Sequence, residues 1–128
     1  GSNYYYTIDN PDNKKFVEAY KKKFKGVPPG YAGAAGYGLM KMTLLGMQKS
    51  GSTEPQKVIT ALEEHKGKNF VGNFEIRGRN HQTVRPFFVL QTKKKSEMKN
   101  KYDMAEVVDV SSTEQPKNIN MCKDIGSF

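Results

Sequence analysis

Tryptophan is absent from this sequence of 128 residues, cysteine occurs once and histidine occurs twice. The single cysteine, Cys122, excludes a disulfide within the chain and any metal site built from several cysteines. A catalytic histidine needs a nucleophile or a carboxylate within hydrogen-bond distance. Neither His65 nor His81 lies in a motif that supplies one. The sequence therefore predicts no enzyme activity, no metal site and no cofactor.

Long apolar runs and acidic residues are also scarce. The most apolar segment, residues 31–47, is too short to span a membrane and is interrupted by Lys41. Lysine and arginine together number 21 against 13 acidic residues, which gives a net charge of +8. The lysines gather at residues 21–25, 66–68 and 93–101, without the regular aromatic spacing of single-strand-binding surfaces. Such clusters are typical of solvated faces, and a nucleic-acid or anion-binding surface is the alternative.

Helical periodicity dominates the first half of the chain. Asn10 is a favourable N-cap, Pro11 suits the first position of a helix, and Gly26 is a typical end. An apolar stripe recurs along this first helix at every fourth residue: Phe16, Tyr20 and Phe24. This spacing predicts an amphipathic helix that packs through one face.

The second helix is expected over residues 31–49, and its first half is rich in glycine and alanine. Glycine costs about 1 kcal/mol relative to alanine inside a helix. These small residues therefore predict a close approach of the helix backbone to another element or to a ligand. A third helix follows, with Thr53 and Gln56 at the spacing of a capping box. His65 is expected at its C-terminal end as a partner of the helix dipole.

Strands are expected in the second half of the chain, at residues 70–76, 84–92 and 102–110. A turn at residues 78–82 joins the first two, and His81 is expected to fix it through hydrogen bonds from its side chain to the backbone. Residues 3–8 are predicted to be an extended arm or the tail of a strand, without a recognisable partner. Residues 111–128 are expected to form an irregular tail.

An ordered set of short motifs runs from Asn10 to Cys122. The motifs are Asn10-Pro11, Phe16 with Tyr20, Pro29 with Tyr31 and Tyr37, residues 49–53, Gly72 with Phe74, Ile76 and Arg77, His81-Gln82, Arg85-Pro86 with Phe88 and Val89, and residues 101–103 with Glu106, Val107 and Val108. In this order they resemble the C-terminal part of the type I periplasmic solute-binding proteins of ABC importers, in the branched-chain amino-acid class. The sequence departs from the usual pattern at Ala32, where related sequences often carry a bulky aromatic residue, and at residues 77–80, where an acidic residue is commoner.

The resemblance implies an α/β fold that is part of one lobe of the type I periplasmic binding fold. Three helices would pack on a sheet that other sequence largely supplies. Residues 1–92 would form the back half of the first ligand-binding lobe, including the last crossover strand between the lobes. Residues 93–128 would form a C-terminal strand and the irregular tail, and the whole would be a single truncated domain.

The resemblance also implies a function, which is capture of an amino acid or a similar small polar solute for an ABC importer. The first residues of the second helix, Tyr31 and Ala32, would contact the solute, or Tyr31 would simply pack at the start of the helix. The implied partners are the solute and the membrane permease, with no nucleic acid. The implied location is periplasmic or extracellular, with or without a lipid anchor. Uncovered apolar faces would favour a homodimer of this portion.

Two alternatives stay open from the residues alone. One is an independent basic α+β module that binds nucleic acid or an acidic partner, and the other is a ligand-sensing domain of a signalling receptor. Cys122 would be a free reactive thiol or, in an exported protein, would pair with a cysteine on a segment outside this sequence.

Overall fold

The computed structural model describes residues 1–78 and 80–112. In chain order the elements are α1 (Pro11–Lys23), α2 (Tyr31–Ser50), α3 (Pro55–Leu62), β1 (Lys66–Asn69), β2 (Gly72–Ile76), β3 (Thr83–Val84), β4 (Pro86–Thr92), a 3₁₀ turn (Lys95–Glu97) and β5 (Ala105–Ser112). All three predicted helices are confirmed. The mixture of helices and strands agrees with the expected α/β class.

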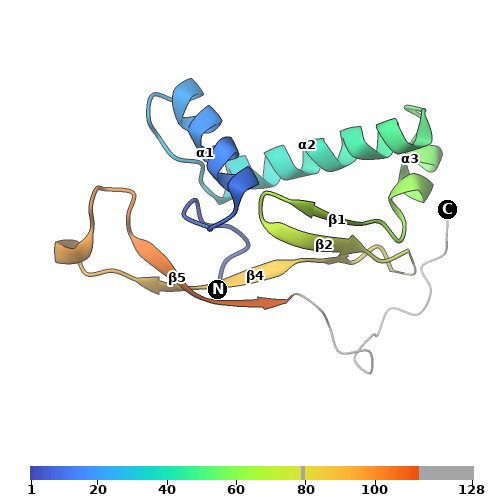
Figure 1. Cartoon of the computed structure of the whole chain (residues 1–128). Coiled ribbons are helices and arrows are strands. Elements are labelled where there is room, and N and C mark those ends of the chain that lie inside the picture. The colour runs from blue at the N-terminus through green and yellow to red at the C-terminus, as the bar shows by residue number, and fades with distance from the viewer. Residues whose placement is uncertain (79, 113–128) are drawn as a thin grey trace.

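The described strands form two antiparallel sheets, one with the order β1-β2-β3 and one in which β4 pairs with β5. Figure 1 shows α1 and α2 on the same side of the strands, with the β1–β2 hairpin between α2 and the long β4–β5 hairpin. Strand β4 belongs to the predicted segment 1–92 and β5 to the segment 93–128, so one sheet contains parts of both. The assignment of either segment to a lobe stays a prediction.

The predicted strand 70–76 is shorter than expected, because Phe70 and Val71 lie in the turn of the β1–β2 hairpin. The Asn69 Oδ1 atom accepts a hydrogen bond from Val71 N at 2.9 Å, and Gly72 has a φ of 131°, where side chains other than glycine are strained. Strand β1 is absent from the sequence-based prediction. Its sequence, KGKN, lacks the alternating apolar residues that indicate a strand.

The other predicted strands are shifted along the chain. Strand β4 begins at Pro86 rather than at Val84, which belongs to β3. Strand β5 covers Ala105–Ser112 rather than residues 102–110, so its last two residues were wrongly expected in the tail. Residues 113–128, with Cys122, lie outside the described part of the chain.

The predicted N-cap is right for α1 and wrong for α3, and α1 ends at Lys23, before the predicted end at Gly26. Asn10 Oδ1 accepts a hydrogen bond from Asp12 N at 2.8 Å, as its N-cap position predicts. In α3 the N-cap is Glu54, without a capping bond from its side chain, so the expected box of Thr53 and Gln56 does not form. Because Pro55 follows, Glu54 is held in an extended conformation, and the helix begins one residue later than a cap at Thr53 would require.

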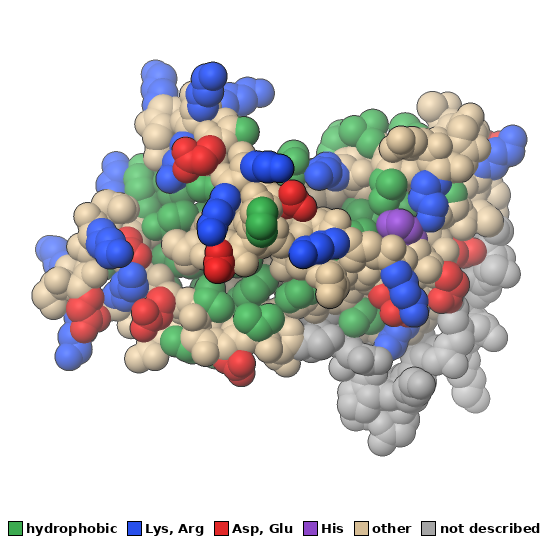
Figure 2. Space-filling view, viewed as in Figure 1, with side chains coloured by type: hydrophobic (Ala, Val, Ile, Leu, Met, Phe, Trp, Pro, Cys, Tyr) green, Lys and Arg blue, Asp and Glu red, His purple; other side chains and the backbone are tan. Residues whose placement is uncertain are grey.

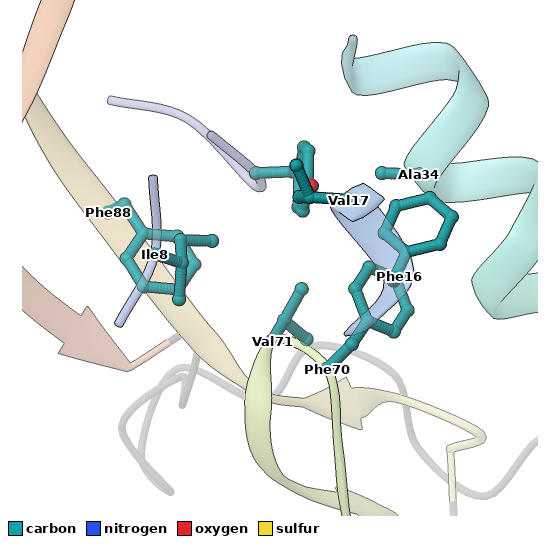
Figure 3. Close-up of a cluster of buried hydrophobic side chains, with 8 residues drawn as sticks. Ile8, Phe16, Val17, Ala34, Phe70, Val71 and Phe88 are labelled. Atoms are coloured by element: carbon teal, nitrogen blue, oxygen red, sulfur yellow. The ribbon is translucent and has the colours of Figure 1, made fainter. Parts of the chain in front are cut away.

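The hydrophobic core forms where the N-terminal segment, α1, the start of α2, the β1–β2 turn and β4 meet. Its buried members are Tyr4, Ile8, Phe16, Val17, Ala34, Phe70, Val71 and Phe88. Figure 3 shows Phe16 and Phe70 together beneath Ala34, with Val71 between them and the pair formed by Ile8 and Phe88. The Phe16 ring also stacks on Tyr37 of α2, with centroids 4.3 Å apart. Most of the predicted apolar face of α1 is therefore confirmed, although Phe24 at its end is 46% exposed.

The N-terminal segment has a partner that the sequence did not indicate. Ser2 forms an antiparallel bridge to Phe88 of β4, with hydrogen bonds of 2.7 and 2.9 Å between their backbone atoms. The Tyr5 hydroxyl donates to Tyr102 O at 3.1 Å and accepts from Ala105 N at 3.0 Å. This segment therefore joins both strands of the β4–β5 hairpin to the core.

Asn13 is the fully buried side chain that ties this segment to α1. Its amide nitrogen donates to the carbonyl oxygens of Tyr6 and Ile8 at 3.0 and 2.9 Å, and its oxygen accepts from the Tyr4 hydroxyl at 2.9 Å. All three partners lie before α1 in sequence. A single side chain thus bonds to polar groups of three residues, of which Ile8 O also accepts from Asn10 N at 3.0 Å.

The glycines of α2 fall into two groups. A Cβ atom at Gly46 would lie 2.7 Å from Val58 Cγ1 and 3.0 Å from Leu62 of α3, and one at Gly33 would lie 3.0 Å from the Tyr20 hydroxyl. A Cβ atom at Gly36 would have no neighbour within 4 Å. The predicted close approach is confirmed at Gly33 and Gly46, where α2 meets α1 and α3.

We expect Asn13→Ala to lower the free energy of unfolding by about 2 kcal/mol, because the Tyr4 hydroxyl and Tyr6 O lose their bonds to Asn13 and Ile8 O keeps only the bond from Asn10 N. Chemical denaturation followed by circular dichroism measures this loss. Asn73→Ala, at an exposed position on β2, is the matched control and should change stability by less than about 0.5 kcal/mol. Equal effects of the two substitutions would contradict the anchoring role of Asn13.

Gly46→Ala should destabilise the protein by about 1–3 kcal/mol, since the added methyl group collides with Val58 and forces α3 away from α2. Gly36→Ala adds the same group in open space and should stabilise by up to about 1 kcal/mol through helix propensity. Thermal melts of the two variants show whether each substitution lowers or raises the melting temperature. A stabilising Gly46→Ala would show that the close contact between α2 and α3 is not required.

Candidate functional site

The start of α2 is an exposed helix N-terminus. Pro28 and Pro29 precede it, and the N-cap is Gly30, which is extended and offers no side chain to the first turn. Ala34 N donates to Gly30 O at 3.0 Å, which is the first bond of the helix, while the amides of the first turn have no such partner within it. The Tyr31 side chain is 60% exposed, and Ala32 is exposed as well.

A cavity of about 300 Å³ lies between the first half of α2 and the β1–β2 hairpin. Its walls are mainly apolar, and they include Tyr31, Ala35, Leu39, Met42, Phe74 and Ile76. Polar groups enter from three other places: Asn3 from the N-terminal segment, Thr83 from β3, and Arg85 between β3 and β4. Apolar walls with a few polar groups are typical of small-molecule sites, and this volume is at the lower end of their range.

The two residues predicted to contact a solute are placed differently. Tyr31 lines the cavity, whereas Ala32 is exposed and is not among the lining residues. The sequence analysis did not find Asn3, Thr83 or Arg85. These residues reach the cavity through the N-terminal arm and the short strand β3, for which hydrophobic periodicity gives no signal. Solute contact by Tyr31 and Ala32 stays a prediction.

Tyr4 forms part of the same cavity wall and is buried. Burial raises the pKa of its phenol far above the ordinary value. The hydroxyl therefore stays protonated over the physiological range and remains the donor to Asn13. Tyr4 is therefore a structural residue of this wall, and its hydroxyl remains protonated.

His65 contacts the end of α2 instead of acting as a cation at the end of α3. Helix α3 ends at Leu62, and the Lys49 ammonium lies 2.9 Å from His65 Nδ1. Burial and the charge of Lys49 lower the pKa of His65, so the ring is neutral at pH 7 and its Nδ1 atom accepts from the ammonium. The expectation of a dipole partner at the end of α3 is wrong, because His65 lies beyond the end of that helix and its ring faces Lys49.

The loop that follows β2 is attached to the end of α3 by two carboxylates. His81 Nε2 lies 2.9 Å from Glu63 Oε1, and Gly78 N donates to Glu64 Oε1 at 2.8 Å. Asn80 Oδ1 accepts from Gln82 N at 3.1 Å, which is the kind of turn-fixing bond that the sequence predicted for His81. His81 therefore serves to join two elements through a side-chain pair.

Within residues 1–78 and 80–112, no group of three or more His, Cys, Asp or Glu side chains is arranged to hold a metal ion. Among the described helices, none combines the length and apolarity that a membrane span requires.

The fold described above is found in a known protein family. The model of the periplasmic binding protein family matches residues 1–97 of the chain. This chain belongs to the periplasmic binding protein family. The motifs that run from Asn10 to Arg85 and Pro86 lie within the matched residues, so the resemblance derived from them is confirmed.

Solved structures of periplasmic binding proteins share this fold. An amino acid ABC transporter substrate-binding protein from Pseudomonas fluorescens Pf-5 is 28% identical, with a TM-score of 0.81, over 89% of this chain and 30% of that protein. A branched-chain amino acid transporter protein from Rhodopseudomonas palustris CGA009 is 27% identical, with a TM-score of 0.70, over 84% of this chain and 29% of that protein. The type I periplasmic binding fold is therefore confirmed.

The chain spans less than a third of the length of these periplasmic binding proteins. No curated protein matches it. A third solved structure, the substrate-binding protein from Sphaerobacter thermophilus, is 22% identical with a TM-score of 0.73 over 86% of this chain and shows the common fold alone.

We expect the Cε1 proton of His65 to titrate in NMR spectra with a midpoint below the ordinary histidine pKa, and Lys49→Met to raise that midpoint. The unfolded chain then binds this proton at a higher pH than the folded chain does. The free energy of unfolding should therefore fall as the pH drops below the ordinary pKa, until the folded state is protonated too. Lys57→Met, on α3, is the control and should leave the midpoint unchanged.

Proposed function

We propose that this chain is a portion of a solute-binding receptor that captures an amino acid or a similar small polar solute for an ABC importer. The observation that carries the proposal is the family match over residues 1–97, together with the fold shared with an amino acid substrate-binding protein at a TM-score of 0.81. The receptor binds its solute without catalysing a reaction. The match favours this function over an independent nucleic-acid-binding module.

The surface of α2 supports the proposal that other sequence of the receptor completes the lobe. Leu39 is 72% exposed, Met40 59% and Leu44 55%, although all three lie in a helix of a binding-protein fold. Apolar side chains this exposed on one helix mark a surface that another element covers. The segments 1–92 and 93–128 then contribute to the ligand-binding lobe and to its C-terminal strand and tail.

Tyr31 is the residue of this chain that we assign to solute contact. It lies at the edge of a mainly apolar cavity, at an uncapped helix N-terminus, and it is 60% exposed within the described part of the chain. A residue that only packed at the start of the helix would bury more of its ring. Ala32 lies beside it in the first turn and offers a backbone amide and a methyl group.

The partners and the location follow from the same proposal. The receptor resides in the periplasm or on the cell exterior, delivers its solute to a membrane permease, and is held at the membrane by a lipid anchor where one is attached. The isolated portion exposes the α2 face described above and should associate with itself to cover it. In the complete receptor, the same face is covered.

Calorimetry on the full-length receptor with a panel of amino acids tests the proposal. Tyr31→Ala should weaken binding of the best solute by about 10- to 100-fold through loss of an aromatic contact, and Tyr31→Phe should retain most of the affinity. Tyr102→Ala, in the loop before β5, is the matched control and should bind as the wild type does.

Two results would count against the proposal. Absence of binding to any amino acid would contradict the assigned solute class. Unchanged affinity in Tyr31→Ala would instead show that Tyr31 packs at the start of α2, and would leave the receptor function in place. The isolated chain of 128 residues should bind no amino acid measurably, because it supplies less than a third of a typical receptor.

A further inference from the structure

The loop between β4 and β5, residues 93–104, is the third lysine cluster of the sequence and contains five lysines against two acidic residues. Figure 1 shows this loop at the outer end of the β4–β5 hairpin, on the opposite side of the molecule from α3. It contains no arginine. A cluster of this kind could be an unstructured solvated loop, so its internal bonds decide whether it is a defined surface.

The two acidic side chains of the loop bind other groups of the same loop. Lys93 Nζ lies 2.7 Å from Asp103 Oδ1, and these two side chains are only 19% and 8% exposed. The second oxygen of Asp103 accepts from Lys99 N at 3.0 Å, and Glu97 Oε2 accepts from Lys94 N at 2.9 Å. The hydrogen bond from Lys93 holds the pKa of Asp103 below its ordinary value, so the carboxylate stays ionised at neutral pH.

The remaining four lysines of the loop point their charges outward. Lys94, Lys95, Lys99 and Lys101 are all exposed, and none has an ion pair within the described residues. Lys101 Nζ lies 5.0 Å from the centroid of the Tyr102 ring, and Met104 beside it is 56% exposed. Figure 2 shows basic side chains along this margin of the molecule, with acidic side chains between them. The loop therefore has a backbone fixed by bonds to its two acidic side chains, of which Asp103 is buried and Glu97 exposed, while four of its lysines face the solvent.

The geometry points to a further function of this loop: the four outward lysines form a contact surface for an anionic phospholipid membrane. Lysine is a compact, flexible charge that suits a diffuse array of headgroups, whereas paired recognition of a single carboxylate or phosphate favours arginine. Each lysine near such a surface strengthens binding about fivefold, and the neighbouring Met104 supplies an apolar side chain for the interface. This surface goes beyond solute capture, and it does not require a particular solute.

Vesicle sedimentation with the full-length receptor, purified without lipid modification, tests this inference. The probes are vesicles of phosphatidylcholine alone and vesicles that also contain phosphatidylglycerol. We expect binding to the anionic vesicles only, weakened by salt. The variant K94Q/K95Q/K99Q/K101Q should lose about 100-fold or more of this affinity. Arginine at the same four positions should retain it.

The matched control is K21Q/K22Q/K23Q/K25Q, which removes the same number of charges from the end of α1 and should keep vesicle affinity within about threefold. Solute affinity of both variants, measured separately, shows that they are folded. Equal losses in the two variants, or no binding to anionic vesicles, would overturn the inference. So would normal vesicle binding of the loop variant with reduced uptake by the reconstituted importer, which would indicate an acidic protein partner.

Discussion

The structure depends on the buried amide of Asn13, which holds the first ten residues against α1. Through its bonds to Tyr4, Tyr6 and Ile8, this side chain fixes a segment that has little regular structure of its own. The same segment bridges to β4 at Ser2 and to β1 through a 3.0 Å hydrogen bond from the Asn10 amide to Asn69 O. Without this anchor, fewer contacts would hold the two described sheets together, because their strands pair only within each sheet.

The position of α2 follows from this arrangement. Its N-terminal half passes close to Tyr20 and Phe70 at Gly33 and Gly38, and its C-terminal half touches Val58 of α3 at Gly46. Small residues make these contacts possible, and they leave the cavity beneath the helix between the points of contact. Gly33 and Gly46 are thus required by the packing of α2 on its neighbours, whereas Gly36 is not, and the exposed start of the helix at the cavity is a consequence of the same geometry.

Sequence reasoning found what local patterns encode and missed what distant backbone contacts create. The starts of α1 and α2 follow from Asn10 and from the paired prolines Pro28 and Pro29, each of which acts on its own neighbours. Strand β1 has no apolar alternation, so only its pairing with β2 reveals it. At the candidate site, Tyr31 came from a family motif. Arg85 and Asn3 reach the cavity from segments far apart in the chain, a juxtaposition that no local spacing records.

The exposed surfaces of this portion are of two physically different kinds. The α2 face that carries Leu39, Met40 and Leu44 gains free energy when it is removed from water, so other receptor sequence is expected to cover it. The lysines of the β4–β5 loop would pay a large desolvation penalty under an apolar cover, and their own acidic neighbours are already engaged. Completion of the lobe should therefore proceed over α2 and leave the hairpin tip in water. A negatively charged partner can therefore bind this tip with the smallest desolvation cost.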